Sequence, residues 1–193
     1  MRVPYVSNPP PTNSPEEESI VAAIEARRHP RPLQPLDLAL LHSPPIASGW
    51  NTFVGAIRTQ TSLSDDLREL AICRIAVVNK AWYEWMHHAP LAVKGGVSSN
   101  AMKELMTDER LVLENIPDGF TEKQWAICVV ADEMTKNVHV ADETFQQLKS
   151  FFNSQEVVEI VATVACYNCV SRFLVALDVG ERNSTTPALP ETV

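Results

Sequence analysis

The residues best suited to chemistry in this 193-residue chain lie between positions 68 and 88. They include Glu69, Arg74 and the run WYEWMHH at residues 82–88. On a helix, Glu84 and His88 are four residues apart, so they share a face and can form a hydrogen bond. A carboxylate beside an imidazole selects its tautomer and raises its basicity, which suits a general base near neutral pH. We therefore predict acid–base chemistry at His88, with Glu84 as a carboxylate that can orient it.

Several neighbouring side chains are candidates for binding a substrate. An arginine in an otherwise apolar segment is too costly to bury unpaired, so Arg74 pairs either with a substrate carboxylate or with an acid of the protein. Cys73 lies one helical turn after Glu69, and His87 points about 100° around the helix from His88. Aromatic side chains add apolar surface and hydroxyl donors. The predicted substrate-binding residues are Arg74, Tyr83, Trp85, His87, Cys73 and Tyr167.

A metal site and a redox thiol pair are two other interpretations of the chemistry-bearing residues. Glu84, His87 and His88 could offer metal ligands, but adjacent histidines diverge on a helix, and we expect neither a metal nor a cofactor. Cys166 and Cys169 form a Cys-x-x-Cys pair well inside a predicted apolar helix rather than at a helix N-terminus, where the dipole would stabilise a thiolate. We expect both thiols to stay protonated and to pack structurally, with a redox role left open.

Helices must position these residues, because apolar residues recur at helical spacing and no hairpin signal separates alternating segments. Ten of the fourteen prolines precede residue 46, which predicts an irregular N-terminal arm. Pro90 is expected to leave a backbone irregularity beside His88. The predicted helices cover residues 15–28, 36–42, 44–58, 65–79, 82–95, 100–106, 121–135, 141–152 and 154–179.

The predicted fold class is all-α, in three parts. Residues 1–35 form a proline-rich arm with the first helix, residues 36–180 form a single helical domain, and residues 181–193 form a flexible tail. Residues 71–78 and 157–165 are apolar nearly all round. Helices of this kind must be covered on several sides, and we expect subunit contacts to supply part of the cover.

Composition restricts the function classes. The chain has 16 Lys and Arg against 24 Asp and Glu, for a net charge of −8, and it has no basic cluster, which argues against nucleic acid as a partner. No apolar run approaches the roughly 20 residues that cross a bilayer, so we expect no membrane partner and a cytoplasmic location. Four cysteines are too few for a disulfide framework, which favours a reducing compartment.

Three motifs resemble the carboxymuconolactone decarboxylase family, which includes the alkylhydroperoxidase D-like proteins. The resemblance spans residues 40–106 and implies an alkylhydroperoxidase D-like helical bundle, a site at helix and subunit junctions, and a trimer or hexamer. A weaker similarity, at Tyr167-Asn168 and Arg172-Phe173, extends the resemblance to the last helix. The three motifs are Arg68-Glu69-Leu70, Tyr83-Glu84-Trp85-x-x-His88 and Ala92-x-x-x-Gly96-Val97-Ser98.

The resemblance also implies what this chain lacks. Peroxidases of the family use a Glu upstream of a Cys-x-x-Cys-x-x-x-His motif, in which the thiols reduce the peroxide and the Glu and His relay protons. If His88 takes the place of that His, the two Cys positions fall on Ala81 and Glu84, and the upstream Glu falls on Glu69. The proton relay is thus retained without the thiols, which disfavours a disulfide-cycling peroxidase.

The decarboxylase branch of the family fits the retained groups better. Loss of CO₂ from an activated acid leaves a dienolate, which needs stabilisation and a proton donor at carbon. His88, oriented by Glu84 or Glu69, is the predicted acid and base. We therefore predict a cofactor-independent decarboxylase, lyase or isomerase that acts on a small carboxylic acid or lactone. Two alternatives stay open: an alkylhydroperoxidase-like antioxidant that uses Cys166 and Cys169 or Cys73, and a noncatalytic oligomeric scaffold. The expected partners are a small-molecule substrate and further copies of the chain.

Overall fold

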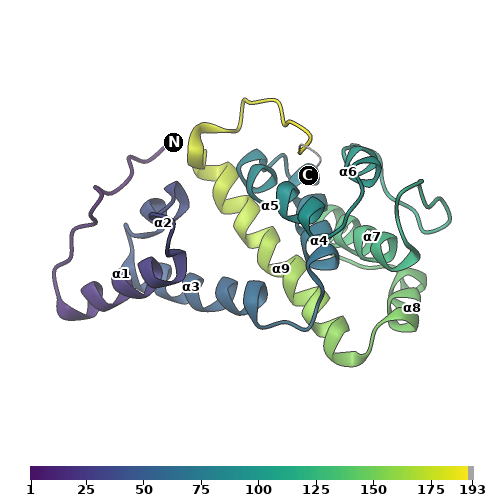
Figure 1. Ribbon diagram of the computed structural model, residues 1–193, viewed down its shortest axis with the longest axis horizontal. Coiled ribbons are helices and arrows are strands. Elements are labelled where there is room, and N and C mark those ends of the chain that lie inside the picture. The colour runs from purple at the N-terminus through teal and green to yellow at the C-terminus, as the bar shows by residue number, and fades with distance from the viewer. Residues whose placement is uncertain (191–193) are drawn as a thin grey trace. The chain divides into compact units, whose positions relative to one another are not determined.

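The computed structural model describes residues 1–190, and every regular element within them is a helix (Figure 1). The prediction of an all-α fold is confirmed. The chain forms two compact units, one made of residues 1–60 with 177–181 and the other of residues 61–176 with the tail from residue 182. The predicted division after residue 35 falls inside the first unit, because α1 and α2 both pack against the helix that follows them.

The first unit is a small group of helices joined by short loops. An ion pair of Arg28 with the buried Asp37, through two contacts of 2.8 Å, holds α1 to α2. The residues before α1 are irregular, as their prolines predict, and the Arg2 N–H donates to the Leu177 carbonyl at 2.7 Å. Proline occupies the first position of each α-helix here, where its missing N–H costs nothing. These elements are α1 (Pro15–Arg28), α2 (Pro35–Leu40), α3 (Pro44–Thr59) and the 3₁₀ turn η1 (Val179–Glu181).

The second unit contains the residues selected for chemistry. Its central helix is α4, which packs against both α5 and α7. The helix boundaries lie close to those predicted from the sequence, because capping residues such as Ser98 and Thr121 accept backbone N–H groups at the helix starts. The helices are α4 (Asp65–Val78), α5 (Trp82–Lys94), α6 (Ser99–Leu105), α7 (Glu122–Asn137), α8 (Asp142–Phe151) and α9 (Ser154–Leu177).

A tight hairpin joins α4 to α5. At the turn, Lys80 has a positive φ of 53°, and the Ala81 N–H donates to the Ala76 carbonyl at 2.8 Å. At the other end of the hairpin, Gly95 lies against the first turn of α4, where an added Cβ would come within 2.9 Å of the Asp66 nitrogen. Glycine therefore lets the two backbones approach closely, and the hairpin brings side chains of α4 and α5 face to face.

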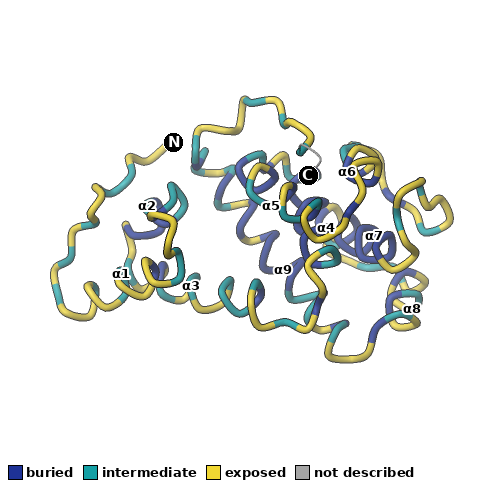
Figure 2. The backbone as a smooth tube through the Cα atoms, viewed as in Figure 1, coloured by how far each residue is buried: buried dark blue, intermediate teal, exposed yellow. Residues whose placement is uncertain are grey.

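Burial differs between the two helices that the sequence predicted to be covered on several sides. Ten of the fourteen residues of α4 are buried (Figure 2), so residues 71–78 are covered within the chain itself. The chain itself covers α9 less completely: Val158 is 66% exposed, and Ala165 is also exposed. Of these two helices, only α4 is enclosed by the chain along most of its length.

The composition of α9 departs from one expectation. By length and apolar content this helix would suffice to cross a bilayer, with a mean hydropathy of 1.7 over its most apolar stretch. Core helices pass the same test, and 44% of that stretch is buried within the structure. The sequence-based expectation that no apolar run reaches this length is therefore wrong for α9.

The proline inside α5 does not break the helix. Pro90 lies on an exposed face, and α5 continues beyond it to Lys94. Proline lacks an N–H, so the local consequence is the loss of the helical hydrogen bond to the Met86 carbonyl. The irregularity predicted beside His88 is thus limited to one missing bond.

Candidate functional site

A carboxylate–imidazole pair lies at the centre of the α4–α5 hairpin. His88 Nδ1 is 2.6 Å from Glu69 Oε2, and both side chains are buried, with 5% and 2% of their surface exposed. An ionised carboxylate only accepts hydrogen bonds, so Nδ1 carries the proton in this pair and Nε2 is the basic nitrogen of the neutral ring. Glu69 therefore acts as the carboxylate that sets the tautomer of His88.

Arg68 supports the same carboxylate from its other side. Its Nε lies 3.4 Å from Glu69 Oε1, and its Nη2 bonds Asp65 at 2.5 Å. The sequence prediction did not include Arg68 among the site residues, although the Arg68-Glu69-Leu70 motif contains it. Its long side chain nevertheless reaches Glu69, and a buried cation there favours the charged form of that carboxylate.

Glu84 does not bond to His88, contrary to the prediction drawn from their four-residue spacing. Both of its carboxyl oxygens are buried and have no hydrogen-bond partner among the described residues. Burial, and next the nearby charge of Glu69, raise the pKa of Glu84 well above its usual value. Burial without a hydrogen-bond partner therefore favours the neutral, protonated form of Glu84, in which it can donate a proton.

Tyr167 approaches His88 from α9. Their rings meet edge to face, with centroids 5.0 Å apart. A buried network positions this part of α9, since the Asn168 side chain donates to Thr135 at 2.9 Å and Asn79 donates to Ser171 at 2.7 Å. Three helices, α4, α5 and α9, thus contribute to the group formed by Glu69, Glu84, His88 and Tyr167, which we call the acid–imidazole cluster.

The thiols near this cluster are protonated. Burial chiefly raises the pKa of Cys73 well above its usual value, with the charges of Glu69 and Glu84 adding to the effect. Burial raises the pKa of Cys166 to about 12, and the proximity of Cys169 and Glu84 contributes. Both residues are free thiols without access to the thiolate form near neutral pH, so Cys73 is not placed to act as a nucleophile.

Arg74 serves the protein rather than a ligand. Its Nε and Nη2 donate to Asp132 Oδ1 at 2.9 and 2.5 Å, and its remaining N–H groups donate to the carbonyls of Leu105, Thr107 and Glu109. These contacts use all five donors of the guanidinium. Of the two partners that the sequence allowed for Arg74, a substrate carboxylate or an acid of the protein, the structure has the acid, Asp132.

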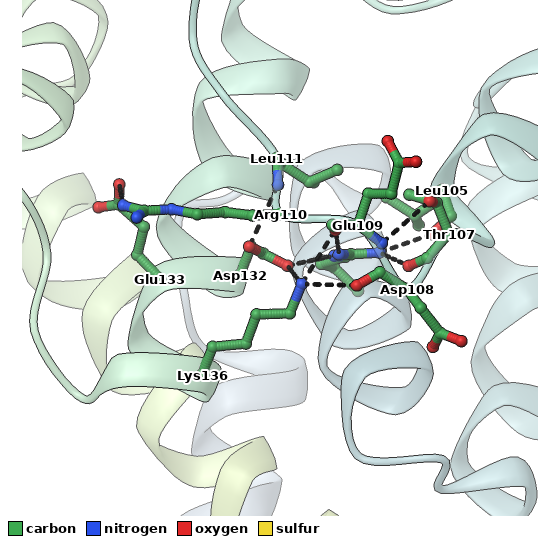
Figure 3. Close-up of polar contacts among 10 residues, drawn as sticks. Leu105, Thr107, Asp108, Glu109, Arg110, Leu111, Asp132, Glu133 and Lys136 are labelled. Carbon is green, nitrogen blue, oxygen red and sulfur yellow. Dashed lines mark hydrogen bonds and ion pairs between the residues drawn. The ribbon is translucent and has the colours of Figure 1, made fainter.

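Asp132, the partner of Arg74, is fully engaged as well. Lys136 Nζ lies 3.1 Å from its Oδ1, and the Leu111 N–H donates to its Oδ2 at 3.2 Å (Figure 3). Both Arg74 and Asp132 are completely buried. Because a buried charge must be paired and hydrogen-bonded, this group fastens the loop after α6 to α4 and α7.

The other predicted binding residues lie outside the acid–imidazole cluster. Tyr83 and His87 form a ring contact with each other, with centroids 4.6 Å apart. Trp85 is buried and donates from Nε1 to the Ala188 carbonyl at 2.8 Å. Within residues 1–190, no group of three or more His, Cys, Asp or Glu side chains is arranged to hold a metal ion.

Comparison with known proteins agrees with this architecture. Residues 44–113 match the carboxymuconolactone decarboxylase family. No curated protein matches the chain significantly in sequence.

Solved structures with the same fold are distant in sequence. An uncharacterized peroxidase-related protein from Ralstonia eutropha JMP134, described as an alkylhydroperoxidase AhpD core, has a TM-score of 0.72 at 17% identity and covers 97% of each chain. A peroxidase-related protein from Silicibacter sp. TM1040 has a TM-score of 0.68 at 15% identity, over 91% of this chain and 92% of that one.

A third similar structure is a cysteine-to-alanine variant of the debrominase Bmp8 in complex with 2,3,4-tribromopyrrole. It has a TM-score of 0.67 at 18% identity and covers 86% of this chain and 84% of its own. Identities this low establish the fold alone. Residues 44–113 therefore resemble the carboxymuconolactone decarboxylase family model, and the chain has the fold of a structure described as an alkylhydroperoxidase AhpD core.

Proposed function

We propose that this protein is a cofactor-independent enzyme that moves protons on a small carboxylic acid or lactone, as a decarboxylase, lyase or isomerase. The observation that carries the proposal is the 2.6 Å contact between His88 and Glu69 beside Glu84, a buried carboxyl group without a hydrogen-bond partner among the described residues. One basic nitrogen and one protonated acid in a shared low-dielectric setting are the two groups that proton transfer at carbon requires.

In an isomerisation, His88 Nε2 removes a proton from the carbon next to a carbonyl group. The electron pair of that C–H bond moves into a dienolate, and the Glu69 carboxylate stabilises the imidazolium that forms. Glu84 then donates its proton to a different carbon of the dienolate, and the imidazolium returns a proton to the Glu84 carboxylate. The cycle leaves every group as it began.

A decarboxylation needs fewer steps from the same residues. The C–C bond to the carboxylate breaks, CO₂ leaves, and the bonding electron pair forms the dienolate. Glu84 protonates the carbon that lost CO₂, and water restores its proton through His88. The raised pKa of Glu84 supports this role, because an acid that is ionised at neutral pH has no proton to give.

The thiol arrangement favours acid–base chemistry over peroxide reduction. Cys73 and Cys166 are buried and have raised pKa values, and Glu84 stands at the position where the resemblance places a peroxidase cysteine. The fold accommodates small planar rings in one distant relative, the debrominase bound to tribromopyrrole. His88 is only 5% exposed, so a substrate of this size must displace neighbouring side chains to reach it.

Exchange of substrate protons with solvent tests the proposal directly. A panel of small unsaturated acids and lactones is incubated with the protein in D₂O, and the products are analysed by NMR for deuterium at carbon and for released CO₂. Turnover with at least one compound that is lost in His88→Gln is the expected result. Peroxide turnover with a thiol reductant that disappears in Cys166→Ser/Cys169→Ser, without any deuterium exchange, would instead identify a peroxidase.

A noncatalytic scaffold gives a third pattern. In that case no compound of the panel is turned over, and the NMR signals of His88 show the same titration with and without each acid. A ligand-dependent change in the titration of His88 counts against a scaffold.

A further inference from the structure

A cavity lies on the face of α5 that points away from the acid–imidazole cluster. Trp82, Trp85, Met86 and Ala89 are spaced three and four residues apart, so they share one face of the helix, whereas Glu84 and His88 lie on another. The first group lines a cavity of about 350 Å³. The opposite wall is formed by residues 182–190, which we call the tail strap.

The tail strap has hydrogen bonds within itself and one hydrogen bond to α5. Near its start, the Thr185 N–H and hydroxyl both donate to the Arg182 carbonyl, at 3.0 and 2.8 Å. Farther along, the Trp85 indole donates to the Ala188 carbonyl at 2.8 Å. Pro187 and Pro190 restrict the backbone around that contact. Because of these constraints, we expect the tail strap to arch across α5 and leave space beneath it, and not to pack flat against the helix.

The floor of the cavity is apolar and accessible. Met86 is 40% exposed, Trp82 is half-buried and Pro90 is exposed. Indole faces and a thioether form favourable contacts with the faces and edges of flat rings. Their combination under an arch favours a planar, largely apolar ligand.

One cationic side chain, Arg182, lines the same cavity. Arg182 lines the cavity, is exposed, and its guanidinium forms no hydrogen bond or ion pair with residues 1–190. A guanidinium binds a carboxylate through two parallel hydrogen bonds. In a chain of net charge −8, an uncommitted arginine beside an aromatic floor provides a local attraction for an organic anion.

We propose that the cavity between α5 and the tail strap binds a small aromatic carboxylate. Its ring lies on Trp82 and Met86, and its carboxylate meets Arg182. This site is separate from the acid–imidazole cluster, because the two occupy different faces of α5.

Binding of 2-naphthoate to the full chain tests the proposal. Two of the four tryptophans line the cavity, so quenching of tryptophan fluorescence reports binding, and calorimetry confirms it. We expect saturable binding that Arg182→Gln weakens about tenfold, because a charge-assisted hydrogen bond is lost. Met86→Glu places a negative charge on the floor and should weaken binding by a similar factor. The uncharged amide of the same ring should bind about tenfold more weakly than 2-naphthoate.

Two matched variants separate this site from the rest of the molecule. Arg110→Gln removes an exposed arginine elsewhere, and His88→Gln alters the acid–imidazole cluster; both should bind 2-naphthoate as the wild type does. Circular dichroism and thermal unfolding confirm that each variant is folded. The proposal is overturned by an absence of saturable binding, by wild-type affinity in both Arg182→Gln and Met86→Glu, or by loss of binding in His88→Gln.

Discussion

Glu69 and His88 are 19 residues apart in the sequence, yet a contact of 2.6 Å joins them across the α4–α5 hairpin. The contact assigns the imidazole proton to Nδ1 and leaves Nε2 as the base. It also leaves Glu84, which shares a helix face with His88, as a separate neutral acid. Two carboxyl groups close together thus have different surroundings, because Glu69 is paired with His88 and Arg68 whereas Glu84 has no hydrogen-bond partner among the described residues.

Removal of the base should abolish most proton transfer. His88→Gln is expected to lower kcat/KM for a substrate identified by deuterium exchange by about 10²–10⁴-fold, the usual contribution of a general base. Glu69→Gln can still accept from Nδ1 but lacks the charge that raises the basicity of the ring. Its kcat/KM profile should therefore keep its shape and move its acidic limb to lower pH.

The neighbouring histidine provides the control for this experiment. His87→Gln changes an imidazole that contacts Tyr83 instead of Glu69, and it should leave kcat/KM within about threefold of the wild type. Equal losses in the two histidine variants would show that the region tolerates no substitution and that the assigned base has no special role.

Glu84 should make the protein less stable as the pH rises. Its pKa is raised in the folded state by burial and by Glu69, so above the ordinary carboxyl pKa the unfolded chain releases a proton that the folded chain keeps. The free energy of unfolding then falls by up to about 1.4 kcal/mol per pH unit, until the pH reaches the folded-state pKa. Glu84→Gln removes this dependence, and its stability relative to the wild type should increase from pH 5 to pH 8.

Urea unfolding at several pH values measures the effect of Glu84. Glu104 is exposed on α6, and Glu104→Gln is the matched control, for which we expect a difference from the wild type that does not change with pH. A constant difference for Glu84→Gln as well would contradict the assignment of Glu84 as a neutral acid.

The Arg74–Asp132 pair should be essential for stability. Arg74→Met leaves the completely buried Asp132 without its main partner, and the expected loss is about 3–5 kcal/mol in the free energy of unfolding. Arg110→Ala breaks the more exposed pair with Glu133 and should cost less than about 1 kcal/mol. Similar small losses in both variants by urea unfolding would argue that Arg74 is not a structural anchor.

Thiol reactivity should distinguish the four cysteines. Cys169 is exposed, whereas Cys73, Cys128 and Cys166 are buried, and burial raises the pKa of Cys128 and of Cys166 to about 12. An aromatic disulfide reagent at pH 8 should modify one thiol quickly in the native chain and four after denaturation. Rapid modification of two thiols, lost in Cys166→Ser, would place a reactive thiol beside Glu84 and favour the peroxidase alternative.

The sequence by itself was sufficient for the local structure and for the choice of chemistry. Proline at helix starts, hydroxyl caps and apolar spacing predict the helices, because these signals act within one or two turns of the chain. His88 and Glu84 were selected from residue type and helical spacing, and Glu69 through the resemblance to a family motif. Neither the pairing of Arg74 with Asp132 nor the cavity under the tail strap has a local signal of this kind.

Only the tertiary structure decided which of these residues meet. Spacing allows Glu84 to bond His88, but it does not show that a carboxylate from α4 takes that position, nor that Arg74 finds Asp132 at a distance of 58 residues. Such contacts depend on how closely neighbouring helices pack, and here Gly95 permits the close approach of α5 to α4. The protonation of Glu84 follows in turn, because a carboxyl group that is buried without a hydrogen-bond partner keeps its proton.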